Sequence, residues 1–282
     1  MSATVRGYYP IERRSGEIER LHVQGAALAA DAARMLDLIG VAGGWRCLDL
    51  GCGPEGITDL LSARAGSSGE VVGLDADSVF IDHARLRAQQ RLGSNLSFIV
   101  GDAYATGLPD GSFDLVHSRF LASTAREPEK LLQEAMRLTR PGGVLAFQEP
   151  DIETLHCIPA HPAWQRLRQV LGEIFPLVAG EDRLAHQLFG LLRRHGFEDV
   201  QYRPFLVGFR SDDPMVDYLP ATAESVRGKI FELGLMTPAD LEATLAACRA
   251  HLADPGTVSN FHTVIQVWGT APALREAERA PG

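Results

Sequence analysis

Residues 45–56 read WRCLDLGCGPEG. The first six residues are typical of a buried strand, and Gly51, Gly53 and Gly56 form a G-x-G-x-x-G pattern directly after them. A glycine-rich turn between a strand and a helix lets the backbone approach a nucleotide-like ligand closely, and the helix N-terminus offers it free N–H groups. This stretch therefore predicts an α/β fold that holds a ligand at its first loop.

Short apolar runs alternate with helical patterns through the middle of the chain. Beyond the first strand and loop, we expect strands at residues 71–74, 96–100, 113–117 and 144–147, and helices at residues 57–65, 79–92 and 128–140. Continuous apolar strands joined by helices imply a mostly parallel sheet that is covered on both faces. The chain is therefore predicted to adopt a doubly wound α/β fold.

The second half of the chain is less regular. A helix is expected at residues 184–195, and strands are expected at residues 200–207 and 261–268. The predicted organisation is an N-terminal arm and lid helix (1–42), a Rossmann-like cofactor-binding core (43–150), a helical insertion (151–180), the remainder of the core (181–270) with a second helical insertion (214–253), and a tail (271–282).

The composition argues against several kinds of partner. The 282 residues carry a formal net charge of -9, whereas nucleic-acid-binding proteins usually present a Lys/Arg-rich face to the phosphates. The sequence shows neither a charged-then-apolar leader nor an apolar run of membrane-spanning length. We therefore expect a cytoplasmic protein that binds neither nucleic acid nor membrane.

The cysteines do not predict a metal site. Cys47, Cys52, Cys157 and Cys248 are too scattered for a zinc pattern, and no paired histidines follow at ligand spacing. In the expected compartment they are reduced thiols. We therefore predict no bound metal.

The glycine pattern alone does not distinguish two classes of enzyme. It fits an NAD(P)-dependent oxidoreductase as well as any other protein that binds an adenosine cofactor. Asp75, at the end of the second predicted strand, fits both classes, because an acidic residue there accepts hydrogen bonds from the ribose hydroxyls of either cofactor. The choice between the classes depends on other residues.

Two further carboxylates favour S-adenosylmethionine. Asp49 stands two residues before Gly51, where dinucleotide-binding strands normally carry an apolar residue. A carboxylate facing the loop suits a ligand with an ammonium and a sulfonium group better than it suits a pyrophosphate. Asp102 follows the third predicted strand, where it can accept a hydrogen bond from an adenine amino group.

Five motifs in order resemble those of the class I S-adenosylmethionine-dependent methyltransferases. They are DLGCGP (49–54), VGLD (72–75), GDA (101–103), FDLV (113–116) and LTRPGG (138–143). The resemblance covers roughly residues 45–148 and is greatest to the small-molecule branch that includes the ubiquinone/menaquinone-biosynthesis methyltransferases. It implies S-adenosylmethionine as cofactor and a seven-stranded sheet whose last strand is antiparallel. The two helical insertions depart from the minimal form of the family.

The resemblance also implies which residues bind the cofactor. Asp49, Gly51 and Gly53 correspond to the family's contacts with the methionine moiety. Asp75 and Ala76 correspond to its contacts with the ribose, and Asp102 and Ala103 to its contacts with the adenine.

The lid helix and the neighbouring segments supply further candidates for the cofactor site. Arg20 and Gln24 lie four residues apart on one edge of the predicted lid helix, from which they can reach the cofactor carboxylate. Ser118 follows the fourth strand, at the carboxyl edge of the sheet. Tyr9, in the N-terminal arm, is predicted to close the methyl pocket. These four residues are expected to bind the cofactor from outside the conserved loop motifs of the family.

Candidates for catalysis follow the fourth and fifth strands. His117 and Glu149 are predicted to contact the acceptor, with Glu149 accepting a proton or orienting an amine. The insertions are expected to wall an apolar acceptor pocket with Trp164, Phe175, Tyr218, Phe231 and Met236. Those same aromatic and apolar side chains could instead form the contact of a homodimer.

The predicted activity is methyl transfer to an O, N or C atom of a small, largely apolar metabolite by in-line displacement. Alignment of donor and acceptor can supply roughly 7–11 kcal/mol of barrier reduction, so a strong base is not required. Two alternatives stay open from the sequence: an NAD(P)-dependent oxidoreductase, and a non-catalytic protein that binds S-adenosylmethionine.

Overall fold

The computed structural model describes residues 16–54, 56–90, 95–179 and 184–273. Its centre is a seven-stranded sheet in the order β3-β2-β1-β4-β5-β10-β7. The strands are β3 (Leu96–Val100), β2 (Glu70–Asp75), β1 (Arg46–Leu50), β4 (Phe113–Arg119), β5 (Thr139–Asp151), β10 (Thr263–Thr270) and β7 (Glu198–Phe205). Only β10 pairs antiparallel with its neighbours in this sheet, which confirms the predicted mostly parallel fold with an antiparallel last strand.

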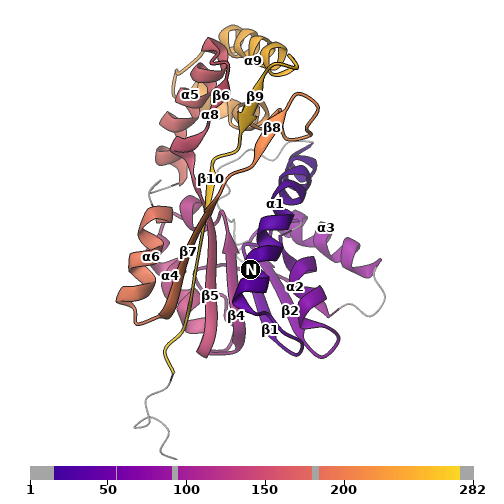
Figure 1. Cartoon of the computed structure of the whole chain (residues 1–282), viewed down its shortest axis with the longest axis vertical. Helices are drawn as coiled ribbons and strands as arrows, with labels where there is room; N and C mark the ends of the chain where they lie inside the picture. Colours follow the sequence, from indigo (N-terminus) through magenta and orange to yellow (C-terminus); the bar gives the residue numbers. More distant parts are fainter. Residues whose placement is uncertain (1–15, 55, 91–94, 180–183, 274–282) are drawn as a thin grey trace, which may run out of the picture.

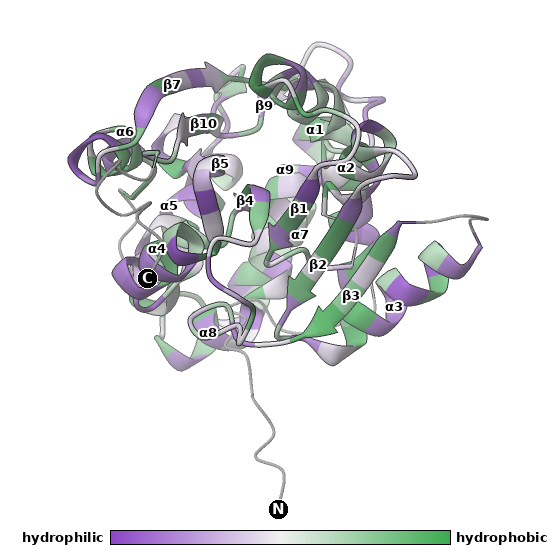
Figure 2. Cartoon of the chain, turned by 90° about the horizontal axis from the view of Figure 1, so that it is seen from below, coloured by the Kyte–Doolittle hydropathy of each residue, from purple (hydrophilic) through white to green (hydrophobic). Residues whose placement is uncertain are grey.

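The central strands are apolar because both of their faces are covered. Leu48 and Leu50 of β1 and Val71, Val72 and Leu74 of β2 are at most 2% exposed. A strand with one wet face would alternate apolar and polar side chains, and these two do not. Figure 2 shows β2 as largely hydrophobic, whereas α3 is coloured as a mixture of hydrophobic and hydrophilic residues.

Two layers of helices cover the sheet (Figure 1). One layer consists of α1 (Glu17–Ile39), α2 (Thr58–Ala65) and α3 (Ser78–Gln89), and the other of α4 (Pro128–Leu138) and α6 (Leu184–Arg194). From α1, the buried side chains of Ala32, Met35 and Leu36 pack on the sheet. The lid helix of the prediction is therefore also a structural helix of the core.

The rest of the chain forms a cap beyond the carboxyl ends of the parallel strands (Figure 1). Its helices are α5 (Pro162–Ala179), α7 (Tyr218–Ser225), α8 (Arg227–Glu232) and α9 (Pro238–Leu252). They enclose a separate apolar cluster that contains Trp164, Leu167 and Leu245. No helix in the part of the chain that the structure describes is long and apolar enough to cross a membrane.

The cap also contains a small sheet that the sequence did not predict. Three short strands, β6 (Cys157–Ile158), β9 (Val258–Asn260) and β8 (Gly208–Arg210), pair antiparallel in that order. Strands of two or three residues are too short to show an alternation of apolar and polar side chains. These segments form strands because the fold brings them side by side, and no local sequence pattern predicts them.

The fifth predicted strand is longer than expected. The sequence predicts residues 144–147, but β5 runs from Thr139 to Asp151 and includes the preceding Pro-Gly-Gly run at residues 141–143. The Gly142 N–H donates to the Ala271 carbonyl at 3.0 Å, and the Ala271 N–H donates to the Gly143 carbonyl at 2.8 Å. These tertiary hydrogen bonds pair the two glycines with the residue that follows β10, while Gly142 itself has a left-handed φ of 70°.

The contribution of the cap core to the free energy of unfolding can be tested directly. Leu167 on α5 is fully buried in the cap cluster, so Leu167→Ala is expected to lower the free energy of unfolding by about 2–5 kcal/mol. Leu206, which is 56% exposed, provides the matched control, and Leu206→Ala should stay within about 0.5 kcal/mol of the wild type. Urea titration measures both; equal, small effects would contradict a packed cap core.

Candidate active site

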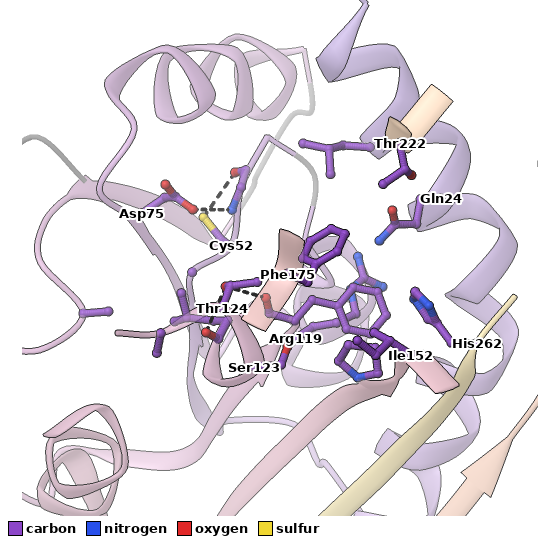
Figure 3. Close-up of a pocket in the computed structure, with 18 of the residues that line it drawn as sticks. Gln24, Cys52, Asp75, Arg119, Ser123, Thr124, Ile152, Phe175, Thr222 and His262 are labelled. Carbon is purple, nitrogen blue, oxygen red and sulfur yellow. Dashed lines mark hydrogen bonds between the residues drawn. The ribbon is translucent and has the colours of Figure 1, made fainter. Parts of the chain in front are cut away.

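A cavity of about 650 Å³ lies where the carboxyl ends of the parallel strands meet α1 and the cap. This volume lies within the range of roughly 300–1,000 Å³ that small-molecule sites occupy. Figure 3 shows Asp75 and Cys52 on one side of the space and Gln24, Thr222 and His262 on another. One continuous cavity therefore joins the predicted cofactor loop to the cap.

Asp49 lies at the end of β1, on the wall of this cavity, and is 1% exposed. Its Oδ1 is 2.7 Å from Nδ1 of His117, and its Oδ2 accepts the Ile57 N–H at 2.9 Å. Burial acts to raise the pKa of this carboxyl, but its interaction with His117, the hydrogen bond from the Ile57 N–H and the charge of Arg119 together lower it. Asp49 is therefore held ionised and also caps the start of α2.

Gly56 permits this arrangement. Its φ of 52° lies in the left-handed region, and a Cβ atom built on it would lie 2.2 Å from Oδ2 of Asp49. Any side chain at this position would displace the carboxylate or the turn. The third glycine of the motif is therefore required by the close approach of the loop to Asp49.

Asp75 ties the glycine loop to the end of β2. Its Oδ2 accepts the Gly53 N–H at 2.8 Å (Figure 3), and its Oδ1 accepts the Asp77 N–H at 2.8 Å. Burial raises the pKa of Asp75, while these two hydrogen bonds act to lower it. Each carboxylate oxygen can accept a second hydrogen bond, so Asp75 keeps the capacity to bind two hydroxyl groups.

The loop after β3 brings Asp102 and Ala103 to the same cavity. Oδ1 of Asp102 accepts the Tyr104 N–H at 2.8 Å, which closes a tight turn. Glu134 of α4 holds the far end of this loop, because its Oε1 accepts the Thr106 N–H at 2.8 Å and the Thr106 hydroxyl at 2.6 Å. The hydrogen bond from Arg137 is the main cause that lowers the pKa of Glu134 to about 2.

The first turns of α1 reach the cavity with Arg20 and Gln24. Nη1 of Arg20 donates to Oε1 of Gln24 at 2.9 Å, and Nη2 donates to Oε1 of Glu17 at 2.7 Å. The guanidinium group is thus oriented before any ligand binds. The predicted residue Tyr9 lies outside the described residues.

Three of the predicted site residues do not line the cavity. His117 and Ser118 are fully buried on β4, and the Ser118 hydroxyl has no hydrogen-bond partner among the residues that the structure describes. Glu149 is fully buried at the end of β5. The expected contact of His117 and Glu149 with the acceptor, and of Ser118 with the cofactor, is thus not seen, because the sheet and its loops cover these side chains.

Glu149 instead supports the turn that follows β4. Its two oxygens accept the backbone N–H groups of Ala122 at 3.1 Å and Ser123 at 3.0 Å, which belong to the short helix η1 (Ala122–Thr124). Burial is the main cause that raises its pKa to about 7, against these hydrogen bonds. Ser123 and Thr124 line the cavity, so Glu149 shapes the wall without touching the space itself.

The cap end of the cavity is mainly apolar and aromatic. Of the five walls expected from the insertions, Phe175 and Tyr218 line the cavity. Trp164, Phe231 and Met236 belong instead to the core of the cap. Among the other apolar residues that line the cavity are Phe80, Phe120, Leu121, Ile152, Leu155 and Leu171.

His262 is the most informative residue that the sequence did not reveal. It lines the cavity, is 6% exposed, and its Nδ1 has no hydrogen-bond partner among the described residues. Its Nε2 is 3.4 Å from the Tyr218 hydroxyl, and its ring meets those of Tyr218 and Phe120 edge-on. Burial lowers the pKa of His262 to about 3, so the ring is neutral. A lone histidine beside an apolar strand gives no sequence signal of this position.

Comparison with known proteins agrees with this geometry. A family model described as a methyltransferase domain matches residues 48–147. The chain is 30% identical over 184 residues to the ubiquinone/menaquinone biosynthesis C-methyltransferase UbiE of Yersinia enterocolitica, covering 59% of this chain and 72% of that protein. It is 35% identical over 130 residues to an uncharacterized 37.1 kDa transposon protein of Streptomyces fradiae, covering 44% of this chain but only 37% of that protein.

The fold is shared with solved methyltransferases. The phosphoethanolamine N-methyltransferase 2 of Haemonchus contortus, solved in complex with S-adenosyl-L-methionine, superposes with a TM-score of 0.52 at 16% identity over 91% of this chain and 53% of that one. The chain belongs to the class I S-adenosylmethionine-dependent methyltransferase family. It is therefore an enzyme whose cofactor is S-adenosylmethionine, and the alternative of an NAD(P)-dependent oxidoreductase is set aside.

The contact between Gly56 and Asp49 predicts a specific binding defect. We expect Gly56→Ala to weaken the binding of S-adenosylhomocysteine by roughly tenfold or more, because the new methyl group displaces Asp49 on top of about 1–2 kcal/mol of backbone strain. Gly234→Ala is the control, since Gly234 also has a positive φ, of 64°, but nothing within 4 Å of its Cβ position. Calorimetry that gave both variants the affinity of the wild type would refute the role of Gly56.

The burial of Glu149 predicts how the free energy of unfolding depends on pH. Because burial raises its folded-state pKa from 4.5 to about 7, the stability from its protonated form is complete below pH 4.5 and is lost as the pH rises towards 7. Glu149→Gln cannot titrate, so the free energy of unfolding of the wild type relative to the variant should fall across this window and then level off. Urea titrations between about pH 4 and 8 measure it; a constant difference would contradict the buried, titrating carboxyl.

Proposed function

We propose that the enzyme methylates an O, N or C atom of a small, uncharged and largely apolar acceptor that binds at the cap end of the cavity. The observation that carries this proposal is the division of one cavity into two ends. The loop end presents Asp49, Asp75 and Asp102, whereas the cap end presents aromatic and aliphatic walls with the neutral His262 among them.

The residues at the loop end fit the cofactor. We assign the methionine moiety to Asp49, Gly51 and Gly53, and its carboxylate to Arg20 and Gln24, all of which line the cavity. An ammonium group pairs with a buried ionised carboxylate, and a carboxylate pairs with a guanidinium. A Cβ atom at Gly53 would project into open space, so the backbone leaves room there.

The remaining cofactor contacts come from the loops after β2 and β3. We assign the ribose to Asp75 and Ala76, and the adenine to Asp102 and Ala103, which line the cavity in that order along the sheet edge. Asp75 has lone pairs for two hydroxyls, and Asp102 offers an acceptor to an exocyclic amino group. The predicted role of Tyr9 at the methyl pocket remains a hypothesis.

The acceptor end is mostly apolar. Phe120, Ile152, Leu171 and Phe175 supply apolar walls, and Figure 3 shows Phe175 and Ile152 facing the same space as Arg119 and His262. Arg119, Glu153 and Arg168 also line the cavity, but the surface around a buried acceptor is mostly apolar and would strip a charged group of its hydration. The Tyr218–His262 pair offers hydrogen bonds to an uncharged hydroxyl, carbonyl or amine.

The chemistry needs positioning more than proton transfer. S-adenosylmethionine supplies an electrophilic methyl group on its sulfonium. The chain holds the acceptor in line with that group, and the cap excludes water from the space between them. His262, with its pKa lowered to about 3 by burial, is a hydrogen-bond partner that orients the acceptor. It is too weak a base at neutral pH to be assigned the removal of a proton.

The cofactor assignment is tested by calorimetry. Asp75→Ala should weaken the binding of S-adenosylmethionine by about tenfold or more, the loss expected when hydrogen bonds from a ligand to a charged group are removed. Asp212→Ala, at a carboxylate that is 71% exposed beyond β8, should bind as the wild type does. Equal affinities in all three proteins would disprove the ribose assignment.

The acceptor assignment is tested with probes that share one ring system. We expect 2-naphthol and 2-naphthylamine to serve as better acceptors than 2-naphthoate, because the mostly apolar walls of the cap end would remove the hydration of an ionised carboxylate. His262→Phe should raise KM for the neutral probes about tenfold and leave S-adenosylhomocysteine affinity unchanged, since His262 lies at the cap end. Preferential methylation of 2-naphthoate, or a loss of cofactor affinity in His262→Phe, would contradict this assignment.

A further inference from the structure

A continuous row of polar side chains crosses the core sheet between the cofactor loop and the edge strand. It passes through five neighbouring strands and ends on α1; its members are Asp49 (β1), His117 (β4), Gln148 (β5), Gln266 (β10), Arg203 (β7) and Asp31 (α1). The four members nearest the cofactor loop are at most 1% exposed. A buried polar row this long needs every one of its hydrogen bonds, because an unpaired member would cost about 1–3 kcal/mol.

The inner half of the row leads from Asp49 to Gln266. Nδ1 of His117 is 2.7 Å from Oδ1 of Asp49, and Nε2 of His117 is 2.9 Å from Nε2 of Gln148. Nε2 of Gln266 donates to Oε1 of Gln148 at 2.9 Å. Each of these side chains therefore contacts the next one directly, without a gap.

The outer half of the row reaches the surface between β7 and α1. Nη1 of Arg203 donates to Oε1 of Gln266 at 2.7 Å, and its Nη2 donates to Oδ1 of Asp31 at 2.6 Å. Gln266 also donates from Nε2 to the Asp31 carbonyl at 3.1 Å. The side chains of Arg203 and Asp31 are 22% and 28% exposed, so the charged end of the row meets solvent.

Arg203 determines how both glutamines of the row are oriented. A guanidinium group only donates, so Gln266 must turn its oxygen to Arg203 and its NH₂ group to Gln148. Gln148 must then present its oxygen to Gln266 and its NH₂ group to Nε2 of His117. Nε2 of His117 is therefore the acceptor, and the proton of the neutral ring is on Nδ1.

The apolar surroundings leave the row no other arrangement. On α1, Leu28 belongs to one apolar cluster and Ala32 and Met35 to another, and Asp31 lies between them. Val264 on β10 belongs to the first of these clusters and Trp268 to the second, with Gln266 between them. A reversed glutamine would face donor to donor with no water to compensate.

We propose that Arg203 is a positioning residue for the cofactor site: through the row it keeps Nε2 of His117 an unprotonated acceptor, so that the single ring proton is on Nδ1 and is donated to Asp49, which holds that carboxylate in its binding position. Arg203 acts at the far edge of the sheet and touches no cofactor. Its pairing with Asp31 also connects the same row to α1, the helix that brings Arg20 and Gln24 to the cavity.

The protonation state of the two ring nitrogens of His117 tests this proposal directly. We would record ¹⁵N NMR spectra of the wild type, Arg203→Met and Arg203→Lys, and identify the His117 signals by their absence from His117→Gln. In the wild type, Nδ1 should be protonated and Nε2 unprotonated. Arg203→Met frees the glutamines to reverse, so protonated Nε2 should appear. Arg203→Lys keeps a donor-only group and should retain the wild-type pattern.

Cofactor affinity provides the second readout, with S-adenosylhomocysteine as the probe. Arg203→Met should bind it about tenfold more weakly, and Arg203→Lys should recover most of that loss. Arg210→Met, in a surface ion pair whose side chains are 77% and 71% exposed, is the matched control and should bind normally.

Three outcomes would overturn the proposal. They are a wild-type His117 protonated on Nε2, an unchanged affinity in Arg203→Met, and an affinity loss without any change at the His117 nitrogens. The last of these would indicate a merely structural role for Arg203. The proposal rests on the assignment of Asp49 to the cofactor, which the Asp75→Ala comparison leaves untouched, and none of its outcomes depends on the identity of the methyl acceptor.

Discussion

A carboxylate with almost no contact with water is the constraint on which the site depends. Asp49 is 1% exposed, and an ionised group in such a place must be paired and hydrogen-bonded. His117 supplies one partner and the Ile57 N–H another, at 2.7 and 2.9 Å. The start of α2, the glycine at position 56 and the buried histidine of β4 all follow from the need to keep this one charge in place.

The two ends of the cavity differ in polarity. The loop end is built from carboxylates and backbone N–H groups, which suit a cofactor that is rich in hydroxyl, amino and ammonium groups. The cap end is built from rings and aliphatic side chains around a neutral histidine. Because the cap packs a core of its own, its walls can differ between relatives while the sheet and the cofactor loop stay the same.

Much of the fold and of the cofactor loop could be predicted from the sequence. The strands that carry Asp49, Asp75 and Asp102 are continuous apolar runs, and each aspartate stands at the end of its run or just beyond it. The parallel arrangement then brings the three carboxylates to one edge. The row from His117 to Arg203 and the three short strands of the cap depend on contacts between distant segments, which no local pattern encodes. For the same reason His117 and Glu149 were expected to contact substrate although the fold buries them.

A crystal structure of the protein with S-adenosylhomocysteine would test the central claim most directly. We expect the amino-acid end of the ligand to lie against Asp49 and the glycine loop, with its ribose hydroxyls on Asp75 and its adenine beside Asp102. Its sulfur should face the cap end, near Phe175 and His262. A ligand whose sulfur faced away from the cap, or whose amino group lay far from Asp49, would contradict it.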